Sequence, residues 1–442
     1  MSVFQLIPGV QSYEWGVPGG DKDSIVADLA EATPELGLQR EASKPYAELW
    51  MGTHPTLPSH VLGENHELLN DRLCKDHSLL GEKVVGKYGA SEKGALPFLF
   101  KVLSIAKALS IQAHPDKKLA ERLHAEKPNM YKDDNHKPEM AIAIRAFEGF
   151  CGFRPVREVL EFVEAVPELK QVLKADDTLR TQLKSAADAQ DALWAGQASD
   201  DAQSRVHDAL RAAFGALMRA DASLYEPLVS SIAQRYRAAR SAHTPLEVSD
   251  EVAELVARLD TQFPRDIGVF CTFFLNIVHL VPGQALFLGA DEPHAYLSGH
   301  ILECMAASDN VVRAGLTPKA RDVEVLVDML TYQSARAKDQ ILHAPQWDGD
   351  AAKPNATCLY DPPIEEFSVL VTTLVPGSQT SSQRAIDGPS LVLVVEGKGT
   401  LKVDGQAHEL YAGLVLFVGA ATPIELETSE SVTVARAFIE VA

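Results

Sequence analysis

Cysteine is scarce in this sequence of 442 residues, and the few cysteines present are not spaced for chemistry. They are odd in number, scattered and free of any Cys-x-x-Cys pair: Cys74, Cys151, Cys271, Cys304 and Cys358. This distribution excludes a disulfide framework and a thiolate zinc site. It is typical of reduced, buried thiols in a cytoplasmic protein.

Long apolar runs and an excess of basic residues are also missing. No stretch of eighteen apolar residues occurs, and the first residues lack the basic and apolar regions of a signal peptide. Lys and Arg number 41 against 61 Asp and Glu, a net charge of −20 that argues against a nucleic-acid partner. The same charge repels an anionic small molecule, so such a ligand requires a local basic pocket. We expect a cytoplasmic monomer that binds a small molecule, with no nucleic acid and no membrane partner.

The composition and the hydrophobic pattern change along the chain, and together they predict mainly β structure with an α-helical insertion. Residues 1–155 contain short apolar runs between Gly and Pro, which favours strands and turns. Residues 156–262 are rich in Ala, Leu, Glu and Arg with a period of about 3.6, which predicts a helical domain. Thr244-Pro245-Leu246-Glu247 is a capping box with proline at the first helical position, so a helix is predicted to begin there. Residues 263–335 return to β signals and complete the first β domain.

The last part, residues 336–442, predicts a separate antiparallel barrel or sandwich. Strands are predicted over 367–375, 390–396, 400–403, 414–417 and 431–438, with glycine turns at 396–399 and 403–406. His343 and His408 show no ligand-like spacing, so we expect no metal site here. The segment is interpreted as a scaffold or a lid over the other β domain.

Two short segments carry most of the chemistry, Gln112-Ala113-His114 and His136-Lys137-Pro138-Glu139. Gln112 and His114 are two apart, so on a strand both side chains point to one face. With Glu139 they supply an amide oxygen, an imidazole and a carboxylate, and His294 offers a second imidazole after a strand and a tight turn. This set suits zinc. Spacing alone, however, favours a polar surface pair or a satisfied core contact for Gln112 and His114, and we read His124, His279 and His300 as structural.

Longer motifs strengthen the metal hypothesis. The segments 109–117, 135–141, 293–299 and 308–319 closely resemble the signature segments of type I mannose-6-phosphate isomerase (phosphomannose isomerase). Shorter matches lie at 13–16, 47–54 and 151–155, and the resemblance runs in order from about Phe4 to Thr331. Much of the helical block and the C-terminal hundred residues carry no matching signature.

The resemblance implies a cupin fold, with two cupin-type antiparallel jelly-roll barrels plus the helical domain. It also implies one zinc ion per chain, with Gln112, His114, Glu139 and His294 as the ligands. The implied reaction interconverts D-mannose 6-phosphate and D-fructose 6-phosphate through a cis-enediol, feeding mannose into or out of glycolysis and GDP-mannose synthesis.

The resemblance also implies pocket residues: Arg313, Lys137, His136, Glu303, Asp309, Lys101 and Ser110. Arg313 is expected to stabilise the charge that develops during isomerisation. Lys137 is our preferred proton-transferring base, and Glu303 is the alternative.

Three of these assignments have open alternatives. His136 and Asp309 are assigned to ring opening, or else His136 merely supports a ligand and Asp309 caps a loop. Lys101 and Ser110 are expected to hold the phosphate, unless Lys101 is only a surface lysine at the end of a strand.

Three rival interpretations remain. A cupin dioxygenase or decarboxylase usually needs an open facial triad or three histidines, whereas this set contains an amide and an adjacent lysine. A non-catalytic sugar-binding cupin has no reason to place Lys137 and Arg313 beside a metal. A bifunctional enzyme with guanylyltransferase activity needs a Gly-rich phosphate loop near the N-terminus, which the sequence lacks.

Overall fold

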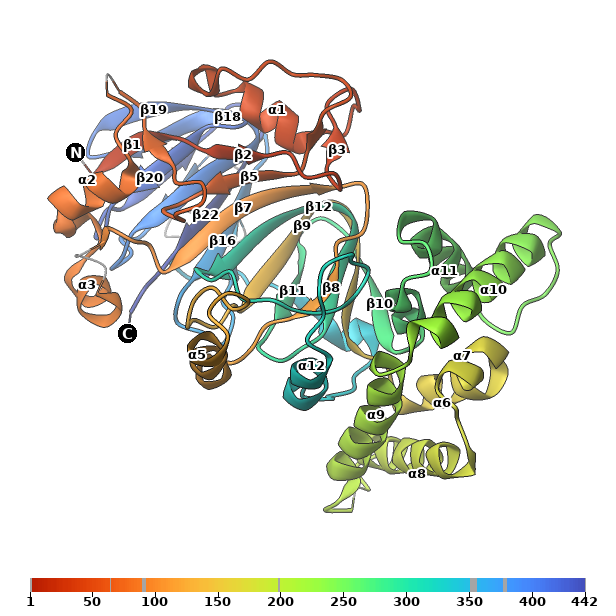
Figure 1. Cartoon of the computed structure of the whole chain (residues 1–442). Helices are drawn as coiled ribbons and strands as arrows, with labels where there is room; N and C mark the ends of the chain where they lie inside the picture. The colour runs from red at the N-terminus through yellow and green to blue at the C-terminus, as the bar shows by residue number, and fades with distance from the viewer. Residues whose placement is uncertain are drawn as a thin grey trace.

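The chain folds into two large antiparallel β-sheets and a helical block that projects from one side of them (Figure 1). The computed structural model describes residues 2–63, 65–89, 93–197, 199–349, 356–376 and 380–441. The predicted combination of two antiparallel β parts with a helical insertion is confirmed. Among the described residues, no helix has the length and apolar character that a membrane crossing needs.

The first sheet, called the central sheet below, has ten strands in the order β14-β11-β9-β12-β7-β5-β2, with β8, β10 and β13 attached beside this path. Its strands are β2 (Gly9–Gln11), β5 (Glu48–Met51), β7 (Phe98–Ile105), β8 (Ile111–Ala113), β9 (Glu139–Phe153), β10 (Leu275–Leu280), β11 (Gln284–Leu288), β12 (His294–Ala306), β13 (Val312–Gly315) and β14 (Ile341–His343). The apolar run at 96–103 forms most of β7, and every residue of this strand is buried because both of its faces are covered.

The second sheet, called the C-terminal sheet, also has ten strands, in the order β15-β16-β22-β18-β20-β1-β6 with β17, β19 and β21 beside this path. Its strands are β1 (Val3–Ile7), β6 (His60–Val61), β15 (Thr357–Tyr360), β16 (Ser368–Leu374), β17 (Thr380–Gln383), β18 (Ser390–Val403), β19 (Gln406–Tyr411), β20 (Val415–Val418), β21 (Ile424–Glu427) and β22 (Val432–Phe438). A small separate ribbon pairs β3 (Val17–Pro18) with β4 (Pro45–Tyr46).

The sheets cross the domain limits predicted from the sequence. β1 and β6 come from residues assigned to the first β domain, but they extend the C-terminal sheet beyond β20. In the opposite direction, β14 follows the expected boundary at 335, yet it pairs with β11 in the central sheet. Each sheet therefore contains chain from both sides of the linear division.

One predicted turn in the C-terminal part is wrong. Residues 396–399 do not reverse the chain, because β18 continues through them with a bulge next to Glu396. Gly397 has φ +84°, and a Cβ there would meet the carbonyl oxygen of Ser431 at 2.0 Å, so the glycine serves the bulge. The turn predicted at 403–406 is confirmed, since Asp404 and Gly405 adopt positive φ between β18 and β19.

The helical block contains α6 (Val156–Ala165), α7 (Pro167–Val172), α8 (Asp177–Trp194), α9 (Ala202–Met218), α10 (Ala222–Ser241) and α11 (Asp250–Gln262). The predicted helix start at Thr244 is wrong. α11 begins at Asp250, where the hydroxyl of Ser249 accepts the backbone N–H of Val252. Glu247, the expected capping carboxylate, instead binds Arg235 of α10.

Shorter helices connect the remaining elements. They are α1 (Ile25–Glu31), α2 (Leu69–Lys75), α3 (Glu82–Tyr88), α5 (Lys117–Glu126) and α12 (Val323–Met329), with single-turn 3₁₀ segments η1 (Pro34–Leu36), η2 (His77–Leu79) and η4 (Ala337–Gln340) and the longer η3 (Ile267–Phe273).

Both sheets share one hydrophobic core. Phe100 and Leu302 of the central sheet belong to the same buried cluster as Phe417 and Leu391 of the C-terminal sheet. Burying a side chain of this size contributes about 1.5–3 kcal/mol, so the many shared residues tie the two sheets together strongly. A second cluster joins the helical block to the β10 side of the central sheet.

Candidate metal centre and cleft

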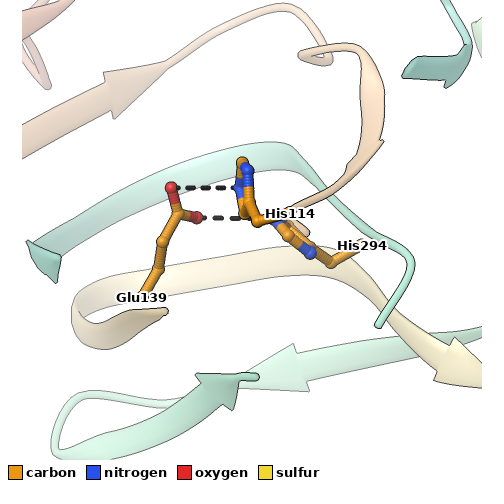
Figure 2. Close-up of side chains that lie close together, drawn as sticks. All are labelled: His114, Glu139 and His294. Atoms are coloured by element: carbon orange, nitrogen blue, oxygen red, sulfur yellow. Dashed lines mark ion pairs between the residues drawn. The ribbon is translucent and has the colours of Figure 1, made fainter. Parts of the chain in front are cut away.

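Three buried side chains from separate parts of the central sheet converge. His114 directly follows β8, Glu139 begins β9 and His294 begins β12, and none is more than 1% exposed. One carboxylate oxygen of Glu139 lies 3.3 Å from Nε2 of His114, and the other lies 3.4 Å from Nε2 of His294 (Figure 2). The three ligand atoms lie within 4.8 Å of one another, so one ion could contact all three.

Hydrogen bonds determine which ring nitrogen of each histidine faces the carboxylate. Nδ1 of His114 lies 2.6 Å from the carbonyl oxygen of Asn310, and Nδ1 of His294 lies 3.0 Å from that of Glu292. Because a carbonyl oxygen only accepts, both Nδ1 atoms carry the hydrogen and both Nε2 atoms keep a lone pair. These Nε2 atoms are buried and find no hydrogen-bond partner in the described part of the chain. Such orphaned acceptors around a carboxylate fit a metal ion.

The electrostatics favour the ligand forms of these groups. Burial, and then the ammonium of Lys137, lowers the pKa of His114 to about 4. Burial alone would raise the pKa of Glu139, but Lys137 and His114 hold it well below its usual range. At neutral pH His114 is therefore a neutral imidazole and Glu139 a carboxylate, the forms in which both bind metals.

The strand register brings Gln112 to the same place. In β8, Gln112 pairs with His294 of β12 on one side and with Arg313 of β13 on the other. Opposed residues in antiparallel strands lie about 4.5–5.5 Å apart at Cα, so the amide stands beside the second imidazole. His114 lies one residue beyond β8 rather than within it. The four residues predicted as metal ligands are thus brought together from three neighbouring strands.

A cleft of about 630 Å³ opens beside this set. Gln112, Ser110 and Arg313 line it together with Phe263 from the end of the helical block and Lys319 from the loop after β13. Burial lowers the pKa of Arg313, and among the described residues its guanidinium takes part in no ion pair. Arg313 is therefore a cation that remains available to a ligand in the cleft.

Neither candidate base lines the cleft, but both are linked to Glu139. The ammonium of Lys137 is 2.8 Å from Oε1 of Glu139, and its side chain is 12% exposed. The hydroxyl of Tyr296 lies 3.4 Å from the other oxygen of Glu139 and 2.9 Å from Glu303. Lys137 therefore reaches Glu139 directly, whereas Glu303 reaches it through the buried Tyr296.

The expectation that Lys101 holds a phosphate with Ser110 requires a correction. Lys101 is 6% exposed and does not line the cleft; its ammonium lies 2.9 Å from Glu303 and 3.8 Å from Glu48. Burial would lower the pKa of Lys101, but these two carboxylates raise it above its usual value. Lys101 is consequently a buried cation that neutralises two acids, and a bulky anion has no access to it.

His136 and Asp309 also lie elsewhere than the ring-opening role requires. Nε2 of His136 is 2.6 Å from a carboxylate oxygen of Glu366, which belongs to the C-terminal part. Asp309 is half exposed and pairs with Nε2 of His54 at 3.5 Å. Neither His136 nor Asp309 lines the cleft. Their contacts correspond neither to the ring-opening role nor to the alternatives of ligand support by His136 and loop capping by Asp309.

Several residues of the site escaped the sequence analysis. Lys107 and Lys319 line the cleft. Lys107 is an ordinary loop lysine in the sequence, and Lys319 ends the 308–319 segment but was given no role. Tyr296 falls within the 293–299 segment, but nothing in a sequence marks a tyrosine whose hydroxyl bridges two buried acids. No sequence pattern distinguished Asn310, whose carbonyl oxygen binds His114, or Asp133, which binds the side chain of Asn310.

These features define the class of the molecule: a two-sheet antiparallel β protein with a helical insertion and a buried His, His, Glu set beside a cationic cleft. Comparison with known proteins gives the family. The type I phosphomannose isomerase catalytic domain matches residues 3–156, its helical insertion domain matches 177–275, and its C-terminal domain matches 358–406.

Whole-chain relatives agree with these matches. The chain is 45% identical to a mannose-6-phosphate isomerase of Cryptococcus neoformans and 42% identical to that of Saccharomyces cerevisiae, over 99% of both chains in each case. A crystal structure of mannose 6-phosphate isomerase from Salmonella typhimurium, bound to fructose 6-phosphate as substrate and to zinc, matches with a TM-score of 0.76 and 28% identity over both full chains. The chain belongs to the type I phosphomannose isomerase family.

Proposed function

We propose that this protein interconverts D-mannose 6-phosphate and D-fructose 6-phosphate, using one zinc ion bound by Gln112, His114, Glu139 and His294. The observation that carries the proposal is the convergence of two orphaned imidazole nitrogens on Glu139, beside a cleft lined by Arg313, for which the described residues supply no ion-pair partner. Membership of the family supports the substrate, and the zinc in its structural relatives supports the metal.

Isomerisation removes a proton from carbon 2 of the open-chain sugar and returns one to carbon 1, through a cis-enediol. Zinc, when bound, supplies a Lewis acid that polarises the carbonyl oxygen. We assign to Lys137 the transfer of the proton from carbon 2 to carbon 1, and its contact of 2.8 Å with Glu139 at the metal site supports this assignment. Glu303 is the alternative base, although its contacts with Lys101 and Tyr296 occupy it.

Arg313 has two properties suited to the charge that develops on the oxygens of carbons 1 and 2. Its guanidinium keeps its charge at any working pH, and no carboxylate neutralises it within the described structure. A preorganised donor aimed at such an oxyanion typically contributes about 3–4 kcal/mol to lowering the barrier. Its cross-strand pairing with Gln112 fixes its distance from the metal site.

The phosphate group is assigned to the outer part of the cleft. Ser110 remains in this role, and Lys319 takes the place that the sequence analysis gave to Lys101. An ammonium and a hydroxyl bind phosphate well. Together with Arg313 and Lys107, Lys319 supplies the local positive field that an anionic substrate needs against a net charge of −20.

The wider setting follows from the reaction. We place the enzyme in the cytoplasm, which its five free thiols support, where it links fructose 6-phosphate of glycolysis to mannose 6-phosphate for GDP-mannose synthesis. We expect it to act as a monomer.

A coupled assay that reports fructose 6-phosphate formed from mannose 6-phosphate tests the proposal. Activity is expected with the purified protein, is abolished by a chelator and returns with added zinc. Persistence of full activity in a protein shown by metal analysis to contain no metal would remove zinc from the mechanism. Absence of turnover in the zinc-loaded protein would refute the proposed reaction.

A further inference from the structure

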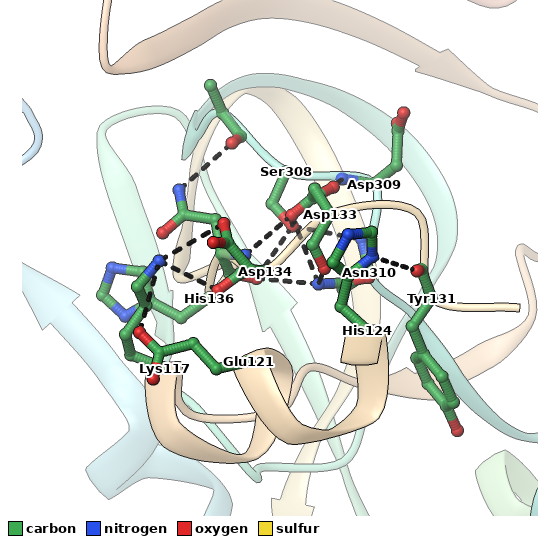
Figure 3. Close-up of polar contacts among 12 residues, drawn as sticks. Lys117, Glu121, His124, Tyr131, Asp133, Asp134, His136, Ser308, Asp309 and Asn310 are labelled. Atoms are coloured by element: carbon green, nitrogen blue, oxygen red, sulfur yellow. Dashed lines mark hydrogen bonds and ion pairs between the residues drawn. The ribbon is translucent and has the colours of Figure 1, made fainter. Parts of the chain in front are cut away.

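A polar cluster adjoins the Nδ1 side of His114, where the carbonyl oxygen of Asn310 meets the ring. Figure 3 shows Asp133 within this cluster, beside Ser308 and Asn310. The carboxylate of Asp133 accepts the hydroxyl of Ser308 at 2.7 Å, the backbone N–H of Asp309 at 2.8 Å and the side-chain amide of Asn310 at 3.2 Å. It also accepts the backbone N–H of Asn135 at 3.0 Å. A single acid therefore binds three consecutive residues of the loop between β12 and β13.

The side chain of Asn310 completes this attachment. Its amide nitrogen donates to the carbonyl oxygens of Asp133 at 2.7 Å and Asn135 at 2.9 Å, and the residue is 1% exposed. Ser308, also buried, accepts the backbone N–H of Asn310 at 3.1 Å. Side-chain and backbone groups of the loop are thus bonded to residues 133–135, the segment that precedes Lys137 and Glu139.

The loop also supplies a contact that orients His114. The carbonyl oxygen of Asn310 accepts the hydrogen of Nδ1, across 196 positions of sequence. His294 differs, because its Nδ1 uses the carbonyl oxygen of Glu292, only two residues away. The orientation of His294 is therefore local, whereas that of His114 depends on the position of a distant loop.

We propose that Asp133 is a positioning residue of the metal centre, which acts through the carbonyl oxygen of Asn310 on His114. This inference rests on the proposed zinc site and extends it to residues that contact neither the metal nor the substrate. The same loop continues into β13, which carries Arg313. Groups that orient a metal-bound histidine typically change metal affinity by about 10–100-fold when they are removed.

The test is the substitution Asp133→Asn, which keeps the size of the side chain but turns one acceptor oxygen into a donor. The matched control is Asp134→Asn, because this neighbour is exposed and its carboxylate pairs with Lys117 at 3.5 Å rather than with the loop before β13. Zinc affinity is measured by competition with a chromogenic chelator, on protein stripped of metal and reloaded. The absorption spectrum of the Co²⁺-substituted protein reports the coordination geometry directly.

We expect Asp133→Asn to bind zinc about 10–100-fold more weakly and to shift the Co²⁺ bands, while Asp134→Asn matches the parent protein. Ser308→Ala removes the bond to the carboxylate together with the hydroxyl's contacts to Asn135 and to the backbone N–H of Asn310. It should weaken zinc binding in the same direction and covers the case in which Asp133→Asn folds poorly. The thermal midpoint of the metal-free protein is recorded for each variant, to separate metal binding from general stability.

The outcomes separate this inference from the proposed function. If Asp133→Asn and Ser308→Ala retain the zinc affinity and the Co²⁺ spectrum of the parent, the positioning role is wrong, even if the thermal midpoint falls. The proposed isomerase activity then still stands. If the parent protein itself binds no zinc, both the metal centre and the role of Asp133 are refuted together.

Discussion

His136 and Glu366 join the segment beside the metal site to the C-terminal part, through a contact of 2.6 Å between Nε2 and a carboxylate oxygen. His136 immediately precedes Lys137, whose ammonium binds the ligand Glu139. The pKa of Glu366 is lowered despite its burial, because the imidazole of His136 stabilises the carboxylate. The C-terminal part therefore holds the chain next to the proposed base, in addition to sharing a core with the central sheet.

Glu366→Gln tests this link. The substitution weakens a charge-assisted hydrogen bond, and we expect kcat to fall about tenfold with little change in KM, because Lys137 loses its fixed position. Glu365→Gln is the matched control, since that carboxylate is exposed and pairs with Lys87 instead. Steady-state kinetics of the two variants provide the measurement. Equal activity in both would show that the contact with His136 has no part in turnover.

Arg313→Ala should retain zinc and lose turnover. Its guanidinium is not among the ligand atoms, so metal content measured by atomic spectroscopy should stay at one ion per chain. The loss of charge stabilisation should lower kcat about 100–1,000-fold. Arg313→Lys restores the charge without the planar fork and should recover only part of the rate. Near-normal activity of Arg313→Ala would contradict the role given to this residue.

Lys101 and Lys319 should give opposite results when each is replaced by methionine. Lys101 is a buried partner of Glu303 and Glu48, and breaking such a pair typically costs about 3–5 kcal/mol, so the thermal midpoint should fall by several degrees. Lys319 is exposed at the cleft, so Lys319→Met should leave the midpoint unchanged and raise KM for the phosphosugar about tenfold. Thermal unfolding and kinetics on both variants distinguish them. A raised KM with normal stability in Lys101→Met would restore the original assignment.

Much of the fold and of the candidate metal site could be predicted from the sequence, because both depend on local patterns. Strands and helices follow from the periodicity of consecutive residues, and the predicted metal ligands lie in short contiguous motifs. What the sequence could not supply was the pairing between distant strands. The register of β7 with β12 places Lys101 opposite Glu303, and this pairing turns an apparent phosphate ligand into a buried ion pair. The predicted helix start at Thr244 failed for a related reason: Glu247, the expected capping residue, pairs with Arg235 of α10 instead.

Contacts between residues far apart in the sequence are not marked by any local sequence pattern. Glu366 lies in a segment without any recognised motif, and only the shared core of the two sheets brings it to His136. The places of β1 and β6 in the C-terminal sheet were equally invisible, because the identity of a strand's partner leaves no mark on its own period-two pattern.

A buried ion pair in the helical block makes stability depend on pH. Glu168 of α7 accepts two bonds from Arg235 of α10, at 3.0 Å from Nε and 2.7 Å from Nη2. Burial would raise the pKa of Glu168, but the guanidinium lowers it below its ordinary value of 4.5. A carboxyl group with a lowered native pKa stabilises the fold above its unfolded pKa, and this contribution is lost as the pH falls through the native value.

Glu168→Gln should therefore destabilise the protein at pH 7 by about 1–2 kcal/mol, a figure reduced because Arg235 is partly exposed. The difference from the parent should shrink as the pH falls below 4.5, where the parent carboxyl also becomes protonated. Asp177→Asn is the matched control, since that carboxylate is fully exposed on α8 and contacts only Arg180 within its own helix. Urea unfolding at pH 7 and at successively lower pH measures the free energies. A destabilisation that stays constant across this range would show that the bond geometry, and not the charge of Glu168, stabilises the packing of α7 on α10.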